Sequence, residues 1–219
     1  MAMQFHCNGT AIEIAVDQLI VAGWTGRNIE AVQHHIDELA AIGVAPPSTV
    51  PLYYRVSNAL LTQDDAIQVV GEESSGEVEP LLLKVAGNLY LGLGSDHTDR
   101  GLEAHSVAAS KQICAKPVAS EVWAFDEVAD HLDQIELKCS IKEDGAWVAY
   151  QDGTLASIRP LAELMAGADF ADNMAMLCGT LGAIGGVRPA SDYKMEMVDP
   201  VLGRSLAFGY QARNLPVIS

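Results

Sequence analysis

The stretch that decides the fold of this 219-residue chain is SSGEVEPLLLKVAGNLYLGLGSDHTDR, residues 74–100. Glu77 and Glu79 stand near its start and Asp96 near its end, on either side of an apolar run. A Gly-Asn pair at 87–88 interrupts that run, and such a pair is typical of the two-residue turn of a β-hairpin. The stretch therefore predicts two antiparallel strands that gather carboxylates at their open end.

The register of this hairpin decides which carboxylates meet. If the Gly-Asn pair forms the turn, Ala86 lies opposite Leu89, and counting outward places Glu79 opposite Asp96. Side chains alternate along a strand, so Glu77 shares the face of Glu79. Directly opposed residues have Cβ atoms roughly 5 Å apart, and like charges at that distance repel each other. The register thus predicts three carboxylates on one face, in need of a positive charge.

A divalent cation would neutralise these three carboxylates. Carboxylate oxygens are hard ligands that suit Mg²⁺ or Mn²⁺, with Ca²⁺ as an alternative, and they do not suit zinc. The same pattern also fits an ordinary solvated strand end without any ion. Pro80 lacks a backbone donor, so it favours an edge strand or a bulge at this point.

The rest of the chain predicts an α+β fold, a mixed β-roll with a few peripheral helices, because strand and helix patterns do not alternate regularly. We expect a single domain over residues 1–219. The best-marked helix spans 28–42, where Asn28 caps it, apolar residues recur at helical spacing and Gly43 ends it. The other predicted elements are strands over 3–22, weaker helices over 102–114 and 119–132, a hairpin turning at 144–145, a helix beginning near Pro160, a buried strand over 173–180 and a closing strand pair over 193–215.

Composition excludes several partners. The formal net charge is −16, so neither nucleic acid nor an anionic membrane surface is an expected partner. Hydrophobic residues make up 49% of the chain, enough for a sizeable core. The four cysteines lack metal-site spacing, and the chain shows neither a signal-peptide pattern nor an apolar run of about 18 residues. We therefore expect a cytoplasmic protein with reduced thiols.

Two short motifs carry a resemblance to a known family. GEVE at 76–79 and GSDHTDR at 94–100 resemble the Glu-x-Glu and Asp-x-Thr-x-Arg metal motifs of the fumarylacetoacetase superfamily, and look closest to a bacterial branch of it. The resemblance implies the β-roll of the family's catalytic domain. It also implies that Glu77, Glu79 and Asp96 bind one divalent ion, the same three residues that the hairpin register brings together.

Further segments resemble the family in the same order. HIDELAAIGVAPPSTVPLYYRVSNA, residues 35–59, is similar to the family's His-x-x-Glu helix and the strand that follows it, and CGTLGAIGGV, residues 178–187, is similar to its glycine-rich loop. The resemblance implies a catalytic group of His35, Glu38 and Lys116 and a substrate-binding group of Arg55, Ser57, Arg100 and Thr180. Residues three apart on a helix share a face, so Glu38 is suitably spaced to orient His35. His34 remains a rival for His35, and Lys111 a rival for Lys116.

The chain also departs from the family pattern. The gap between Glu79 and Asp96 is shorter than in most members, Gly101 replaces a common acidic residue, and Leu181 replaces the loop proline. The glycine-rich segment GTLGAIGG lacks the Gly-Lys-Ser/Thr ending of a phosphate-binding loop, so it does not indicate a nucleotide site.

The resemblance implies a hydrolase that cleaves a C–C bond of a 1,3-dicarbonyl or 2-oxo carboxylate through a metal-bound enolate. Decarboxylases, hydratases and isomerases of 2-oxo acids use the same kind of site, and a non-catalytic protein that binds metal and acid is the alternative from another class. The expected partner is a small carboxylate substrate. Family members are commonly homodimers, and we expect the same assembly here.

Overall fold

The computed structural model describes residues 1–41 and 46–218; the side chains of His35, Glu38, Leu39 and Ala41 are outside this description. The strands are β1 Ala2–Cys7, β2 Thr10–Ala15, β3 Gln18–Gly23, β4 Leu52–Val56, β5 Leu61–Thr62, β6 Ala66–Val70, β7 Ser74–Ser75, β8 Val78–Val85, β9 Asn88–Ser95, β10 Thr98–Asp99, β11 Lys116–Ala124, β12 Glu136–Glu143, β13 Ala146–Thr154, β14 Met174–Leu177, β15 Asp192–Asp199 and β16 Arg204–Leu215. The α-helices are α1 Ile29–Ala41, α2 Arg100–Glu103, α3 Val107–Gln112 and α4 Leu161–Gly167, and the 3-10 helices are η1 Asn58–Leu60, η2 Phe125–Glu127, η3 Ala129–Gln134 and η4 Leu155–Ser157.

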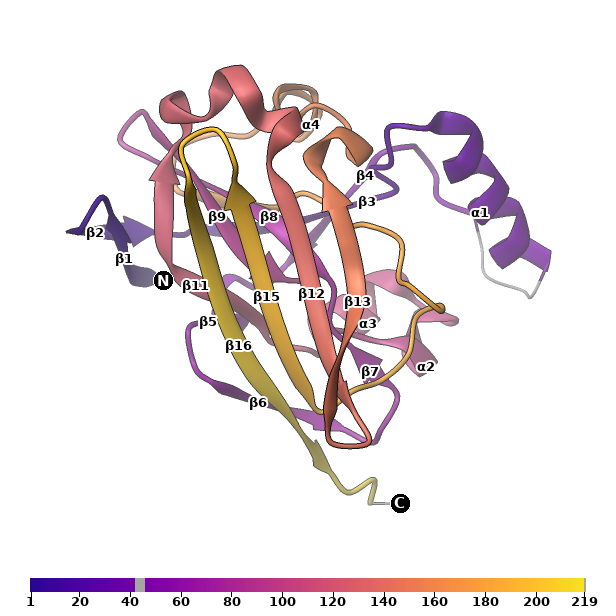
Figure 1. The fold of residues 1–219 in the computed structure, drawn as a ribbon. Helices are drawn as coiled ribbons and strands as arrows, with labels where there is room; N and C mark the ends of the chain where they lie inside the picture. Colours follow the sequence, from indigo (N-terminus) through magenta and orange to yellow (C-terminus); the bar gives the residue numbers. More distant parts are fainter. Residues whose placement is uncertain (42–45, 219) are drawn as a thin grey trace.

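Two large sheets build the molecule (Figure 1). The first has nine strands: β2-β1-β11-β9-β8-β14-β3-β4 in spatial order, with β5 added beside β11. It curls into a half-barrel, so that β2 packs against β8 although the two are not neighbours in the sheet. The second sheet has five strands in the order β13-β12-β15-β16-β6 and lies across the first, while α1 stands to one side. The predicted α+β fold, a mixed β-roll with a few peripheral helices, is confirmed.

The core has two parts because both faces of the curled sheet are covered. Between the two sheets, side chains such as Leu82 of the first sheet pack with Met195 of the second. Inside the curl, a smaller cluster includes Leu81 and Leu177. Neighbouring residues of β8 thus enter different clusters, as strand alternation requires. No helix among the described residues is long and apolar enough to cross a membrane.

Most of the predicted elements are confirmed. Residues 3–22 form three strands, the closing strand pair is β15 and β16, and the hairpin turn has Asp144 and Gly145 at positive φ. Asn28 caps α1, since its Oδ1 accepts from the backbone N–H of Ala31 at 3.1 Å. The predicted end of that helix at Gly43 lies outside the described residues. The first residue of its predicted apolar stripe, Ile29, is exposed.

The turn of the central hairpin differs from the prediction by one residue. Ala86 and Gly87, both at positive φ, form the turn, and Val85 pairs with Asn88. Glu79 consequently pairs with Gly94 instead of Asp96. The prediction placed the turn at the Gly-Asn pair because an alanine at positive φ is uncommon. The shift moves each pairing by two residues, and a shift of two preserves the face on which every side chain lies.

Two other predictions about strands were wrong. The segment over 119–132, expected to be helical, is the end of β11 followed by 3-10 turns. A register shift between Val118 and Val122 interrupts the strand alternation, so buried residues come in adjacent pairs four positions apart. This spacing resembles the apolar spacing of a helix. Pro80 lies in β8, an interior strand. Its carbonyl accepts from Cys178 N just beyond the last paired residues of β8 and β14, so the interior position costs only the one return bond that a proline cannot donate.

Candidate metal centre

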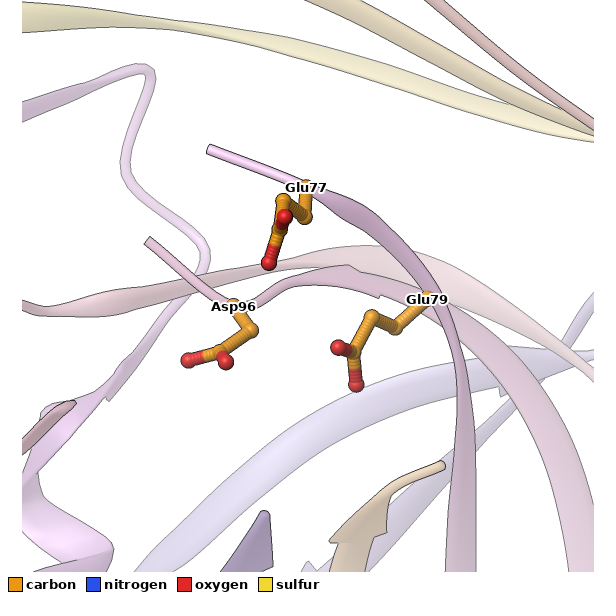
Figure 2. A group of neighbouring side chains, drawn as sticks. All are labelled: Glu77, Glu79 and Asp96. Atoms are coloured by element: carbon orange, nitrogen blue, oxygen red, sulfur yellow. The ribbon is translucent and has the colours of Figure 1, made fainter. Parts of the chain in front are cut away.

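Three carboxylates meet at the open end of the central hairpin (Figure 2). Glu77 immediately precedes β8, Glu79 lies within it, and Asp96 immediately follows β9. One oxygen from each side chain lies within 4.8 Å of the others. By alternation all three project into the curl of the nine-stranded sheet, on the face that carries Leu81. The hairpin therefore positions the group that the sequence predicted, although in a different register.

The group is buried to different degrees. Glu79 and Asp96 are 2% and 1% exposed, whereas the Glu77 side chain is 14% exposed. Burial and the neighbouring charge of Asp96 raise the pKa of Glu79 well above its ordinary value. Burial acts on Asp96 in the same direction, but Lys111 and Lys116 outweigh it and hold the pKa of Asp96 below its usual range. Two of the three carboxylates thus have very different electrostatic environments.

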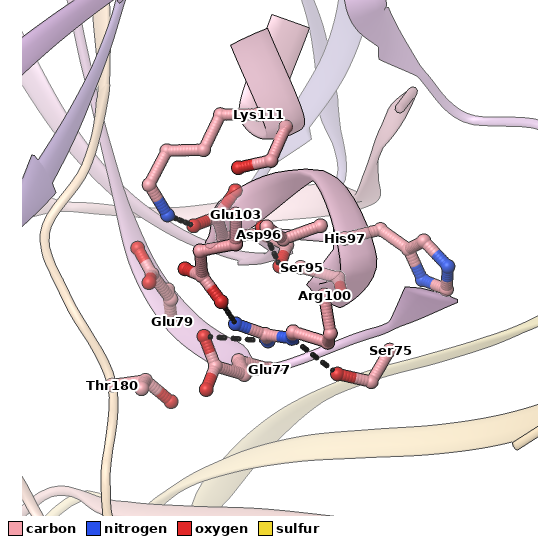
Figure 3. Close-up of polar contacts among 12 residues, drawn as sticks. Ser75, Glu77, Glu79, Ser95, Asp96, His97, Arg100, Glu103, Lys111 and Thr180 are labelled. Carbon is pink, nitrogen blue, oxygen red and sulfur yellow. Dashed lines mark hydrogen bonds and ion pairs between the residues drawn. The ribbon is translucent and has the colours of Figure 1, made fainter. Parts of the chain in front are cut away.

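Two buried lysines contact the single carboxylate of Asp96. Lys111, from α3, binds Oδ2 with its Nζ (Figure 3). Lys116, the first residue of β11, has its Nζ 3.0 Å from Oδ1 and also donates to the carbonyl O of His97. Burial lowers the pKa of Lys116, and Lys111 acts in the same direction. The structure thus brings the predicted Lys116 and its rival Lys111 to the same place.

Arg100 neutralises the second carboxylate. Its Nη2 lies 3.1 Å from Glu77 Oε2, its Nη1 lies 3.0 Å from Glu103, and its Nε donates to Ser75 Oγ at 2.7 Å. Ser75 belongs to β7, which pairs with β10 directly before α2. These contacts fix the guanidinium beside Glu77. They place Arg100, which was predicted to bind substrate, at the carboxylate group. There it orients Glu77, a candidate metal ligand.

The glycine-rich loop closes the site on its other side. Gly179 N donates to Glu79 Oε2 at 2.9 Å, and Thr180 Oγ1 donates to the carbonyl O of Val78 at 2.7 Å. Gly179 has a φ of +97°, and a Cβ built there would lie 1.6 Å from Thr25 Oγ1, so only glycine fits. The predicted Thr180 is therefore brought to the Glu-x-Glu segment, as Figure 3 shows.

Gln151 supports the site from the second sheet, and sequence reasoning missed it. Its Oε1 accepts from Val78 N at 2.8 Å, and its Nε2 donates to Thr180 Oγ1 and to the carbonyl O of Leu181, both at 2.7 Å. It is 1% exposed, although the preceding residue, Tyr150, is also buried. A bulge in β13 opposite Cys139 and Ser140 allows both to point inward, and nothing in the sequence marks that bulge.

Other predicted site residues lie elsewhere. Arg55 pairs with Ile20, so it shares the face between the two sheets rather than the carboxylate face, and its Nη2 donates to the carbonyl O of Ala168 at 2.9 Å. Ser57 caps η1 through its Oγ and contacts Gln112 through its backbone N–H. The positions predicted for the catalytic pair, His35 and Glu38, lie in α1, but their side chains fall outside the described residues.

His97 makes buried hydrogen bonds to residues outside the carboxylate group. Its Nδ1 and Nε2 each lie 2.9 Å from a hydroxyl, of Tyr210 and Ser74 respectively, and the Tyr210 hydroxyl also contacts Ser95. Burial, followed by the charge of Lys116, lowers the pKa of His97 to about 3. The neutral imidazole therefore joins Ser74 of β7 to Tyr210 of β16, one residue after Asp96 in the chain.

The residues present fit a hard divalent cation. All three side chains of the group offer oxygen ligands, the donor type that Mg²⁺, Mn²⁺ and Ca²⁺ prefer. Asp96 Oδ1 is buried and accepts no hydrogen bond from the described residues, although the ammonium of Lys116 lies 3.0 Å from it. A carboxylate oxygen without a hydrogen bond keeps lone pairs available to a metal ion. A surface cavity of about 570 Å³ is lined by other residues, including Leu60 and Arg213.

Several solved structures share the fold of this chain. The chain matches Cg1458, solved with an inhibitor, with a TM-score of 0.67 and 14% identity over 94% of this chain and 81% of that one. It matches 2-keto-3-deoxy-D-arabinonate dehydratase complexed with magnesium and 2,5-dioxopentanoate, with a TM-score of 0.64 and 14% identity over 97% and 79%. Maleylpyruvate hydrolase from Sphingobium sp. SYK-6 matches with a TM-score of 0.59 and 12% identity over 94% and 76%.

Sequence comparison gives the family. No curated protein matches this chain in sequence. The profile of one family, described as a protein of unknown function, matches residues 22–210, which is most of the chain. The solved neighbours are fumarylacetoacetase-superfamily members, which agrees with the resemblance of the metal motifs. The protein therefore belongs to the DUF2848 family and has the fumarylacetoacetase-type fold.

Proposed function

We propose that this protein is a divalent-metal-dependent enzyme that cleaves a C–C bond of a 1,3-dicarbonyl or 2-oxo carboxylate by hydrolysis. The observation that carries the proposal is the buried group of Glu77, Glu79 and Asp96 with two lysines on one carboxylate. Oxygen ligands suit Mg²⁺ or Mn²⁺, and the dehydratase that shares this fold was solved in complex with magnesium. When bound, the ion would polarise the substrate's carbonyl oxygen and stabilise the negative charge that develops there.

The chain's own residues account for the remaining tasks. Lys111 and Lys116 are cations beside the ligand group, so they can attract the carboxylate of a substrate. Burial of Asp96 and Glu79 excludes water and strengthens every charge interaction in the site. Arg100 holds Glu77 in place, and Thr180 and Gly179 hold the backbone and side chain of the Glu-x-Glu segment. Proton transfer by His35, oriented by Glu38, remains a prediction from the family resemblance.

Dehydration of a 2-oxo acid is the second candidate. A dehydratase and a hydrolase both occur among the neighbours with this fold, and both kinds of reaction need stabilised charge on a carbonyl oxygen. The product formed from each substrate distinguishes hydrolysis from dehydration.

Steady-state assays test the proposal. We expect turnover of at least one acylpyruvate, with Mn²⁺ or Mg²⁺ required and EDTA abolishing it. The panel also contains 2-keto-3-deoxy acids and oxaloacetate, so that a dehydratase or decarboxylase would be recognised by its product. Glu79→Gln should lose metal-dependent turnover, whereas Glu121→Gln, an exposed acid on β11, should retain it. Tight metal binding without turnover of any substrate on the panel would favour a non-catalytic binding protein.

A further inference from the structure

Much of the charge of the carboxylate group is offset by nearby cations before any ion binds. Glu77, Glu79 and Asp96 contribute three carboxylates, and Lys111, Lys116 and Arg100 contribute three cations that lie against them. Glu103, on the far side of Arg100, adds one more carboxylate. A divalent ion that enters this group therefore meets nearby positive charges as well as its ligands.

Lys111 is the cation whose place the family motifs do not explain. It lies in the last turn of α3, a short helix that Ser106 caps by accepting from Ala109 N at 3.3 Å. The Lys111 side chain is 8% exposed, its Nζ contacts Asp96 Oδ2, and the ring of Tyr54 lies 5.7 Å from the same nitrogen. Tyr54 pairs with Val21 and so projects onto the carboxylate face. Helix α3 thus delivers a second ammonium group to a carboxylate that Lys116 already contacts.

Neutralising Asp96 does not require both lysines. One ammonium would balance one carboxylate, and without an ion the charge of Lys111 is also offset by Glu77 and Glu79. With a divalent ion bound, the cations outweigh the carboxylates and the group carries net positive charge. An anionic ligand would remove that excess. The arrangement therefore favours the ion and the anion together over the ion alone.

We infer that Lys111 couples the binding of the divalent ion to the binding of a carboxylate substrate, so that each binds weakly alone and tightly in the presence of the other. The inference rests on the proposed function, because it requires the metal site. Coupling of this kind is reciprocal, so the factor by which the anion tightens metal binding equals the factor by which the metal tightens anion binding. The anion class is a dianionic chelator, such as the enolised form of a 2-oxo carboxylate.

Titration of the protein with Mn²⁺, followed by the paramagnetic resonance signal of the free ion, tests the coupling directly. Oxalate serves as the anion, since it presents two adjacent oxygen ligands and two charges and is not turned over by a C–C hydrolase of this type. Chelation of Mn²⁺ by oxalate in solution is measured without protein and is the same for every variant. For the wild-type protein we expect oxalate to tighten Mn²⁺ binding about tenfold or more, within the usual range of coupling between sites.

Two substitutions separate charge from structure. Lys111→Met keeps the aliphatic stem and removes the charge, so Mn²⁺ alone should bind about fivefold more tightly, while the enhancement by oxalate should fall. Lys111→Arg keeps the charge and should retain the enhancement, which preserves the test if the methionine variant does not fold. Lys84→Met is the matched control, because Lys84 lies on the same strand as Glu79 but near its other end, and it should behave as the wild type.

Equal Mn²⁺ affinity with and without oxalate in the wild-type protein would overturn the inference. So would a loss of Mn²⁺ affinity in Lys111→Met, since Lys111 would then merely hold Asp96 in place for the metal. Either result leaves the proposed function standing, because the metal still binds. Absence of Mn²⁺ binding under both conditions would overturn the inference and the proposed function together.

Discussion

Glu77 and Asp96 face each other across the end of the central hairpin, where the backbone N–H of Asp96 donates to the carbonyl O of Glu77 at 3.1 Å. This bond lies one residue beyond the last paired residues, Val78 and Ser95, and extends the same register. It sets the two carboxylates on one face of the sheet, with Glu79 two residues further along β8. The candidate site is therefore a direct consequence of how two strands pair.

Gln151 should be essential to the shape of the site. Gln151→Met would leave Val78 N and the carbonyl O of Leu181 without their partners in a buried region, and each such loss costs about 1–3 kcal/mol. We expect the free energy of unfolding to fall by about 2–4 kcal/mol in urea titrations, and Mn²⁺ binding in the presence of oxalate to weaken. The control is Gln68→Met, at an exposed position of β6. Unchanged stability in Gln151→Met would show that its hydrogen bonds are replaced by others.

Asp199 should make stability depend on pH at the turn between β15 and β16. The residue is fully buried, and its Oδ1 accepts from Val201 N, Leu202 N and His131 Nε2 at 3.0–3.1 Å. Burial opposes ionisation, but these hydrogen bonds and His131 outweigh it and lower the pKa of Asp199. A lowered native pKa means that the stabilisation is present above the unfolded value of about 3.9 and is lost as the pH falls through the native value.

The test compares urea unfolding of the wild type and Asp199→Asn between pH 7 and pH 2.5. We expect the variant to be less stable at pH 7 by about 1–3 kcal/mol, and the difference to shrink below about pH 4. Asp65→Asn, at an exposed position, serves as the control. A difference that stays constant down to pH 2.5 would mean that the charge of Asp199 contributes nothing to stability.

The sequence predicts the face of each carboxylate better than their pairing. The turn lies one residue earlier than the Gly-Asn pair suggests, because Ala86 adopts positive φ, yet the group survives because the pairing shifts by two residues. Family resemblance supplied Lys116, Arg100 and Thr180, all of which lie at the site. It also supplied Arg55, whose strand position turns it to the opposite face.

Other parts of the site depend on contacts that no local pattern records. Gln151 reaches it from the second sheet, and only because a bulge rotates one strand position inward. Lys111, which the sequence offered only as a rival for Lys116, approaches from a short helix whose path is set by the packing of α2 and β10. The predicted helix over 119–132 failed for a related reason, since tertiary pairing with β1 and β9 decided the conformation of β11.

The catalytic histidine remains a prediction. If His35 transfers the proton, His35→Ala should lower turnover by roughly 10²–10⁴-fold, the usual contribution of general acid–base catalysis. Metal affinity should hardly change, because His35 is not a proposed ligand. His34→Ala is the matched control, since successive residues of a helix project about 100° apart. Both variants are compared by steady-state kinetics. If His34→Ala is impaired and His35→Ala is not, the family alignment through this helix is wrong by one residue.

The assembly is also a prediction. Fumarylacetoacetase-type proteins commonly pair, so we expect a homodimer that buries surface outside the carboxylate group. Light scattering of the purified protein should give twice the monomer mass of 23.3 kDa. A mass of 23.3 kDa at every usable concentration would exclude the dimer.

The central claim is that Glu77, Glu79 and Asp96 together bind one divalent ion, and crystals grown with Mn²⁺ and oxalate test it most directly. Anomalous scattering from manganese locates the ion without reference to the protein chemistry. We predict one strong anomalous peak with an oxygen of each of the three carboxylates about 2.0–2.6 Å away, the range for hard cations, and oxalate completing the coordination. Crystals of Glu79→Gln should lose the peak. A wild-type map without a peak between these side chains, or with manganese bound only at other residues, would contradict the account.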